Sequence, residues 1–224
     1  MAIEILSREY PTGSVDAFKA DMETMMDWDK VEGSGSIYTF KLHNDADGNS
    51  FAGISIYGHS GDYPTADPIC SNGTNVYSAA MIPTNGHFRF VNFVRWDDGF
   101  CAHATKDSSM PCVGGIYTSF GACKGTDAHT GEVKWVSWEH SSMTGGNTFI
   151  GSEKTASTGK HSHYYTANGK NTVAEKLYAY ATPYTPNGIL RLAMFQDGHI
   201  STCGYCTWNG KRYYRNGAIF IPVE

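Results

Sequence analysis

The chain has 224 residues, enough for one large β domain or two small ones, and 41% of them are hydrophobic, which suffices for a packed core. It carries 17 lysines and arginines against 22 acidic residues, a net charge of −5, without any basic block, so nucleic-acid binding through phosphate neutralisation is disfavoured. With 25 glycines, 13% aromatic residues and only 17% charged residues, the composition favours many turns and strands over long solvated helices. We therefore expect an all-β protein.

Two segments of the sequence bear on its location. The longest apolar stretches, such as residues 218–223, are far too short to span a bilayer, so no membrane insertion is expected. Residues 1–6 lack a basic region followed by a long apolar one, so the sequence shows no secretory signal. We expect a chain that is made and folded in a cytoplasm, with its six cysteines as free thiols.

Residues 1–32 are predicted to form an N-terminal arm followed by the one helix of the chain. Residues 2–10 fit either an edge strand or an arm. Residues 12–28 fit a helix, because Ser14 is a residue type that caps helices and a stripe of apolar residues follows at helical spacing. The stripe consists of Val15, Phe18, Met22, Met25 and Met26. It favours packing within the protein or its oligomer, with a partner-binding face as the alternative.

Residues 33–126 are predicted to form a first β unit. Residues 35–43 alternate apolar and polar side chains with period two, which is typical of a strand with one buried face. The other strands expected in this unit span residues 51–57, 76–82, 87–96, 100–105 and 115–120. Asn85-Gly86 is a strong hairpin signal, because both residues tolerate a positive φ.

Residues 127–224 repeat the order of motifs of the first unit. Residues 85–90 and 187–192 both begin with Asn-Gly and place an arginine between apolar residues, and Phe93 matches Phe195. Strands are expected at residues 132–138, 177–182, 189–195, 199–207 and 218–223. The collinear matches predict an internal duplication. The expected fold is two tandem, similar β-sandwich or small-barrel units, which either stand apart or share one core.

The segment Cys203-Gly204-Tyr205-Cys206 has the spacing of a zinc knuckle or a redox pair. A structural zinc needs four ligands, and no second Cys-x-x-Cys is present. The fold would have to bring in histidines to complete the site, and the candidates are His161, His163 and His199. Cys203 and Cys206 are therefore metal-site candidates, while the expectation is a protein with no metal and no cofactor.

Two further patterns suggest a functional site but also fit ordinary structure. Asp45, Asp47 and Asn49 alternate as in a calcium loop, but Ile56 stands where an EF-hand has its glutamate, and the segment is also a good turn. Cys101 and His103 would share one face of a strand, an arrangement that a cysteine nucleophile and its base could use. Because the sequence contains no established catalytic motif, we do not expect an enzyme, and a cell-wall hydrolase remains an alternative.

Several aromatic residues fall in expected loops, where they could stack on sugars or anchor a protein interface. The binding candidates are Trp208, Tyr164, Tyr165 and Tyr213. Packing in the core or at its rim is the alternative for each of them.

The segments 142–147 and 210–222 carry a resemblance to a known class of proteins. The first is a polar loop of Ser, Met, Thr, Gly and Asn, and the second ends the chain with aromatic and β-branched residues. Together they resemble the terminal strands of phage tail, fibre and decoration proteins, mainly over the C-terminal half of the chain. This resemblance implies a β-sandwich present in many copies in a virion, with adhesion or cementing as its role. It gives no residue a function.

Taken together, these features predict a virion structural protein of a phage-like particle that acts in assembly or host attachment. The expected partners are further copies of the chain in a homo-oligomer, other virion proteins and a host-surface glycan, with residues 1–32 docking on a neighbouring subunit. A carbohydrate-binding or receptor-binding β module is the main alternative.

Overall fold

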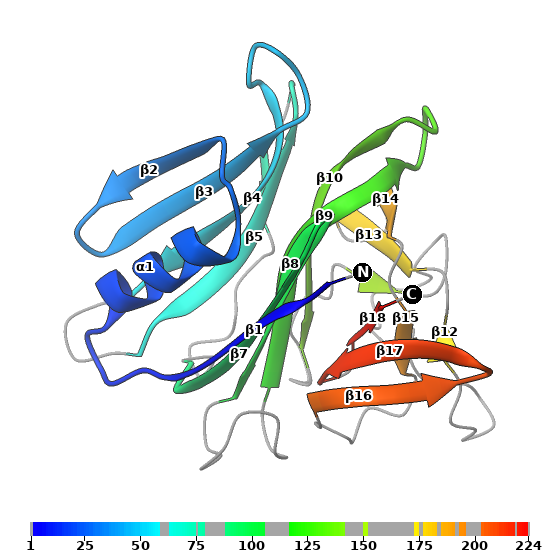
Figure 1. Cartoon of the computed structure of the whole chain (residues 1–224). Coiled ribbons are helices and arrows are strands. Elements are labelled where there is room, and N and C mark those ends of the chain that lie inside the picture. The colour runs from blue at the N-terminus through cyan, green and yellow to red at the C-terminus, as the bar shows by residue number, and fades with distance from the viewer. Residues whose placement is uncertain are drawn as a thin grey trace.

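The computed structural model describes residues 2–58, 63–74, 76–78, 88–105, 117–141, 150–151, 173–174, 177–182, 185–190, 193–195, 203–217 and 219–223. These residues form antiparallel strands in three open sheets and one α-helix, so the predicted all-β class is confirmed. The sheets lie side by side as layers, and we name them the N-terminal, middle and C-terminal sheets (Figure 1).

The N-terminal sheet is a simple meander in chain order. Its strands are β2 (Lys30–Ser34), β3 (Ile37–His43), β4 (Ser50–Tyr57), β5 (Thr65–Asn72) and β6 (Val76–Ser78). The sequence missed β2 and β5. Strand β5 contains Pro68, which argues against a central strand because it cannot donate to the ladder. Pro68 pairs with Ile54 of β4. Among the described residues, the pairing of β5 with β6 ends at Ile69, next to Pro68, so the proline does not interrupt that pairing.

The middle sheet combines strands from both halves of the chain. Its strands are β1 (Glu4–Glu9), β7 (Phe90–Trp96), β8 (Gly99–Thr105), β9 (Tyr117–Asp127), β10 (Val133–Ser141), β11 (Ile150–Gly151), β13 (Leu177–Thr182) and β14 (Thr185–Leu190). The long strand β9 pairs with β8, β10 and β14. Residues 2–10 are therefore an edge strand rather than a free arm, since β1 pairs with β7 along its whole length.

The C-terminal sheet is built from the last third of the chain. Its strands are β12 (Val173–Ala174), β15 (Ala193–Phe195), β16 (Cys203–Trp208), β17 (Lys211–Asn216) and β18 (Ile219–Pro222). The single strand expected at residues 189–195 is wrong, because this segment divides between β14 and β15 in two different sheets. The strand β17 was not predicted, and its lysine and two arginines explain why its apolar pattern is weak.

Asn187-Gly188, matched in the sequence to a hairpin corner, lies inside β14 instead. Thr182 pairs with Thr185, so the β13–β14 hairpin turns before this dipeptide. A Cβ atom at Gly188 would lie 2.6 Å from a methyl group of Val136, so glycine serves close packing there rather than a turn. Asn85-Gly86 lies outside the described residues, and the internal duplication stays a prediction.

The central strands of the middle sheet are buried on both faces, and the core on one of these faces contains residues from both halves of the chain. Every residue of β8 is buried, and alternate residues of β7, β8 and β9 enter two different cores. Phe93, Phe100 and Phe120 point into the first core, while Cys101 and Cys123 point into the second. The predicted boundaries after residues 32 and 126 fall inside β2 and β9, and the second core mixes residues from both predicted units.

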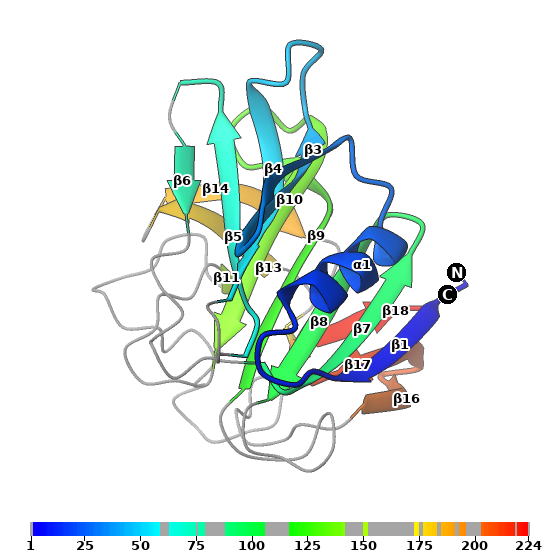
Figure 2. The ribbon, with the colours of Figure 1, turned by 90° about the vertical axis from the view of Figure 1, so that its left-hand side faces the viewer.

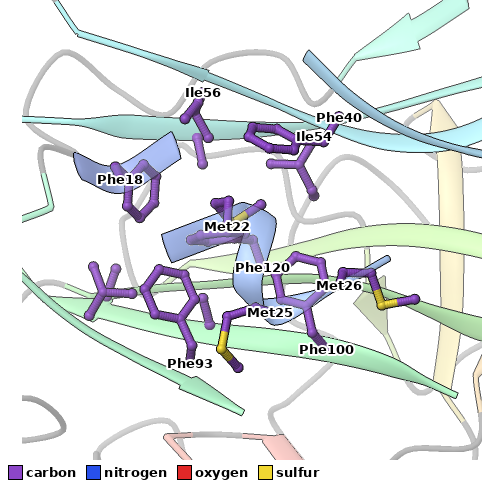
Figure 3. Packing of buried hydrophobic residues seen from close by; sticks show 14 of the residues in the cluster. Phe18, Met22, Met25, Met26, Phe40, Ile54, Ile56, Phe93, Phe100 and Phe120 are labelled. Atoms are coloured by element: carbon purple, nitrogen blue, oxygen red, sulfur yellow. The ribbon is translucent and has the colours of Figure 1, made fainter. Parts of the chain in front are cut away.

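Helix α1 (Val15–Met25) lies between the N-terminal and middle sheets, in contact with β4 of the first and β7 of the second (Figure 2). Its apolar stripe is buried in the first core, so the predicted packing within the protein is confirmed. Figure 3 shows the stripe between side chains of both sheets, including Phe40 and Ile54 on one side and Phe93 on the other. Ser14 precedes the helix as predicted, but its hydroxyl donates to the carbonyl of Pro11 instead of capping.

The turn between β9 and β10 is organised by the carboxylate of Asp127. This carboxylate accepts the backbone N–H groups of His129 at 2.7 Å and Thr130 at 2.8 Å and forms an ion pair with Lys134. Burial raises the pKa of Asp127, but the hydrogen bonds from Lys134 and from the two backbone groups outweigh burial and lower the pKa to about 2. The carboxylate therefore stabilises the fold in its charged form.

Replacing Asp127 by asparagine is expected to lower the free energy of unfolding by roughly 1–2 kcal/mol at neutral pH. The pKa in the folded state is below the unfolded value of about 3.9, so this contribution is present above about pH 4 and disappears as the pH falls toward 2. Urea unfolding at pH 7 and pH 3 measures the change, with the exposed Asp47→Asn as a control that should lose under about 0.5 kcal/mol. An equal loss for Asp127→Asn at both pH values would contradict this assignment.

Candidate binding surface on the C-terminal hairpin

The β16–β17 hairpin carries the most exposed aromatic residue described. The two strands pair from Cys203 opposite Asn216 to Trp208 opposite Lys211. Asn209 and Gly210 form the turn with φ values of +48° and +75°, so the Asn-Gly hairpin signal acts here, at a dipeptide that the sequence analysis did not single out.

Side chains of the hairpin alternate between its two faces. On one face, the ring centroid of Tyr213 is 5.8 Å from that of Phe220 in an edge-to-face contact. Trp208 packs against this pair, so Tyr213 is only 3% exposed and Trp208 is half-buried. Tyr213 is therefore a packing residue rather than an open platform. Tyr164 and Tyr165 lie outside the described residues.

Tyr205 lies on the opposite face of the hairpin and is 58% exposed. Its ring meets that of Tyr214, directly opposite on β17, edge to face with centroids 5.3 Å apart. The guanidinium of Arg212 lies over the Tyr205 ring, 5.1 Å from the centroid. These two contacts hold an accessible aromatic ring beside a positive charge. Because both side chains are already held in place, a ligand that met them would cost little side-chain entropy.

A buried hydrogen-bond network fastens this face of the hairpin to the middle sheet. The side-chain amide of Asn216 donates to the carbonyl of Asn92 at 3.0 Å, and its oxygen accepts from the Asn92 amide at 2.9 Å. The oxygen of the Asn92 side chain also accepts from Ser7 of β1 at 2.5 Å. Because buried amides are costly unless paired, this network sets one position of β17 relative to β7 and β1. Tyr205 thus projects from a fixed support.

His103 and Gly217 form a second contact between these sheets. His103 is fully buried on β8, and its Nδ1 lies 2.9 Å from the hydroxyl oxygen of Ser119. Gly217, in the turn between β17 and β18, has a φ of +65° and lies directly against the imidazole. The glycine therefore allows the C-terminal sheet to approach the middle sheet closely.

The Cys203–Cys206 pair is not one site in the structure. Residues three apart on a strand project from opposite faces, so the two sulfur atoms of β16 diverge. Cys203 is disulfide-bonded, which corrects the expectation of free thiols, whereas Cys206 is free and burial raises the pKa of its thiol.

The calcium-like segment is a turn held by its own carboxylate. Asp45 accepts the backbone N–H groups of Asn49 at 2.9 Å and Ser50 at 2.8 Å, so both of its oxygens are engaged within the loop. The described residues contain no group of three or more metal-ligating side chains, and His161, His163 and His199 lie outside them.

Cys101 and His103 are likewise engaged with other residues. The amide of Asn216 lies 3.2 Å from the Cys101 sulfur, while His103 meets Ser119. Burial raises the pKa of Cys101 to about 12, with a smaller opposing effect of Asn216, so the thiol is protonated at neutral pH. An activated cysteine nucleophile has the opposite shift.

The sequence does not single out Tyr205 as a binding candidate, because this residue stands inside the Cys-x-x-Cys segment, whose cysteines suggest a metal or redox site instead. The signal that could have found this residue is the Asn209-Gly210 turn, which sets the register and places Tyr205 opposite Tyr214.

No helix within the described residues has the length and apolar character that crossing a bilayer requires. Comparisons with protein-family models, with curated proteins and with solved structures give no match.

Proposed function

We propose that this chain is a structural protein of a phage-like particle that acts in host attachment through the Tyr205–Arg212 face of its C-terminal hairpin. The observation that carries the proposal is the exposed Tyr205 ring, held by Tyr214 and Arg212 on a strand pair that is fastened to the protein core. Large exposed aromatic rings with a rigid support are typical binding anchors.

The chemistry of this face suits a host-surface glycan. The Tyr205 ring offers an apolar surface for the C–H groups of a sugar, and Arg212 offers several N–H donors for hydroxyl or carboxylate oxygens. A single small contact of this kind is weak. Many copies in a particle would raise the avidity by orders of magnitude through effective concentration.

Replacing Tyr205 by alanine is expected to reduce binding to host cells or to an arrayed host glycan at least about tenfold, a loss of about 1.4 kcal/mol. The reason is that the substitution removes the stacking surface while leaving the buried network intact. Tyr205→Phe should retain most of the binding. The measurement is binding of labelled protein to host cells and glycan arrays, with circular dichroism to verify the fold.

The matched control is Ile37→Ala, which removes another large exposed side chain, 52% accessible, from β3 of the N-terminal sheet. It should leave binding unchanged. Equal binding by the wild type and Tyr205→Ala would overturn the attachment surface. Glycan binding by a chain that is monomeric and absent from purified particles would favour the carbohydrate-binding module instead.

A further inference from the structure

We infer that two copies of this chain associate through their β1 strands, which pair antiparallel and join the two middle sheets into one. This inference concerns a different surface from the Tyr205–Arg212 face and does not depend on the proposed attachment role. The position of β1, the direction of its peptide groups and the order of its side chains all favour this pairing.

Strand β1 is the outer edge of the middle sheet among the described strands, pairing with β7 on one side only. Figure 2 shows it at the margin of the sheet, beyond β7. Five of its six residues are exposed, including Ile5, a large apolar side chain that is 45% accessible. An accessible edge of this length offers a row of backbone groups to another strand.

The hydrogen bonding of β1 shows which peptide groups face outward. Tyr10, which continues the register of β1, donates its backbone N–H to the carbonyl of Arg89 at 2.7 Å. Backbone N–H and C=O groups alternate in direction along an antiparallel strand. Because those of Tyr10 face β7, the N–H and C=O groups of the other even-numbered residues of β1 also face β7. The N–H and C=O groups of Ile5, Ser7 and Glu9 therefore point to the open edge.

Two other sheet edges carry features that oppose such pairing. Strand β2, the edge of the N-terminal sheet, contains Gly33 with a φ of +103°, which breaks its regular geometry. Strand β16, the edge of the C-terminal sheet, contains Gly204 with a φ of +145°. Strand β1 contains neither glycine nor proline and has no residue with a positive φ. Its geometry is the most suitable of the three for strand addition.

The side chains of β1 are self-complementary in one register. A two-fold axis normal to the sheet can place Leu6 opposite Leu6 of the second copy. Glu4 then lies opposite Arg8, twice, and Ile5 lies opposite Ser7, so an apolar centre is flanked by two pairs of opposite charge. Arg8 is 52% exposed despite its contact with Asp21, so its guanidinium can reach the second copy.

Neighbouring registers lose this match. Moving one strand by two residues, which keeps the same peptide groups facing each other, sets Arg8 opposite Leu6 in one direction and Glu4 opposite Leu6 in the other. Either shift places charge against an apolar side chain and leaves both Glu4–Arg8 pairs unformed. The occupant that fits this edge is therefore a second copy of the same strand.

Replacing Ile5 by proline tests the interface, because proline removes an outward N–H that makes no bond to β7. Native mass measurement of the full chain should give twice the chain mass of 24.5 kDa for the wild type and the single mass for Ile5→Pro. Ile5→Ala keeps the N–H and should remain a dimer. A monomeric wild type at tens of micromolar, or a folded dimeric Ile5→Pro, would overturn the inference.

A second variant tests the register and remains informative if Ile5→Pro fails to fold. Leu6→Cys places two thiols opposite each other across the two-fold axis, so mild oxidation should convert the protein to a covalent dimer on a non-reducing gel. Glu9→Cys, which has no copy of itself opposite, is the control and should not cross-link. Cross-linking of Glu9→Cys but not Leu6→Cys would exclude the proposed pairing.

Discussion

Replacing Phe18 by alanine is expected to lower the free energy of unfolding by about 3–5 kcal/mol. Phe18 is completely buried, and its ring meets Tyr10 at a centroid distance of 5.0 Å, Phe93 at 5.7 Å and Phe88 at 6.1 Å. It also contacts Phe120 at 6.4 Å. The substitution removes the favourable burial of the ring together with these aromatic contacts. It also leaves a cavity between the N-terminal and middle sheets, which cannot easily close because both sheets are rigidly packed.

Urea unfolding followed by circular dichroism and tryptophan fluorescence measures this loss, provided that both signals report one transition. Val133→Ala is the control, because Val133 is 62% exposed and the change should stay within about 0.5 kcal/mol. A loss below about 1 kcal/mol for Phe18→Ala would show that α1 does not connect the two sheets energetically.

Residues 1–32 contribute to the folded core and cannot be deleted without affecting it. Deleting residues 1–32 would remove Phe18, Met22 and Met25 from the first core together with β1, so the shortened chain would lose its fold as well as any interface. Loss of assembly in that deletion would therefore say little about docking. Point substitutions on the exposed side of β1 separate the two effects.

The sequence predicted local structure where a pattern involves one buried face. The apolar stripe of α1 and the alternation of β3 both have a polar side, so their periods are visible along the chain. The central strands of the middle sheet are less clear, because both of their faces are buried. In β8, Phe100, Ala102 and Ala104 alternate with the more polar Cys101, His103 and Thr105, and both sets are buried. The polar side therefore does not mark a solvent-exposed face, and a three-layer arrangement could not be read from it.

The candidate binding surface was less predictable for a related reason. Tyr205 is exposed although it shares its face of the hairpin with Asn216, which contacts the middle sheet, whereas Tyr213 on the other face is buried against Phe220. Both residues are tyrosines in aromatic segments, so the sequence does not distinguish them. Local chemistry indicates a hairpin at Asn209-Gly210, but it does not orient that hairpin. The orientation comes from Asn92 and Asn216, which are 124 positions apart in the sequence and form a buried pair.

The contact between the C-terminal and middle sheets can be tested by adding a single methyl group. Gly217→Ala is expected to lower the free energy of unfolding by more than about 4 kcal/mol. A Cβ atom at this position would lie 2.1 Å from Nδ1 of His103, whose ring is fully buried and held by Ser119. The ring therefore cannot move aside without losing its hydrogen bond, and the C-terminal sheet would have to shift as a unit.

Gly210→Ala is the matched control, because both glycines have a positive φ, at +65° and +75°, and nothing lies within 4 Å of a Cβ atom at Gly210. The control should lose only the strain of a left-handed alanine, about 1–2 kcal/mol. Adding His103→Ala to Gly217→Ala removes the clashing ring, so the glycine substitution should then cost about as much as in the control. Equal losses for Gly217→Ala and Gly210→Ala, measured by urea unfolding, would show that the two sheets are less closely packed at His103 than the geometry requires.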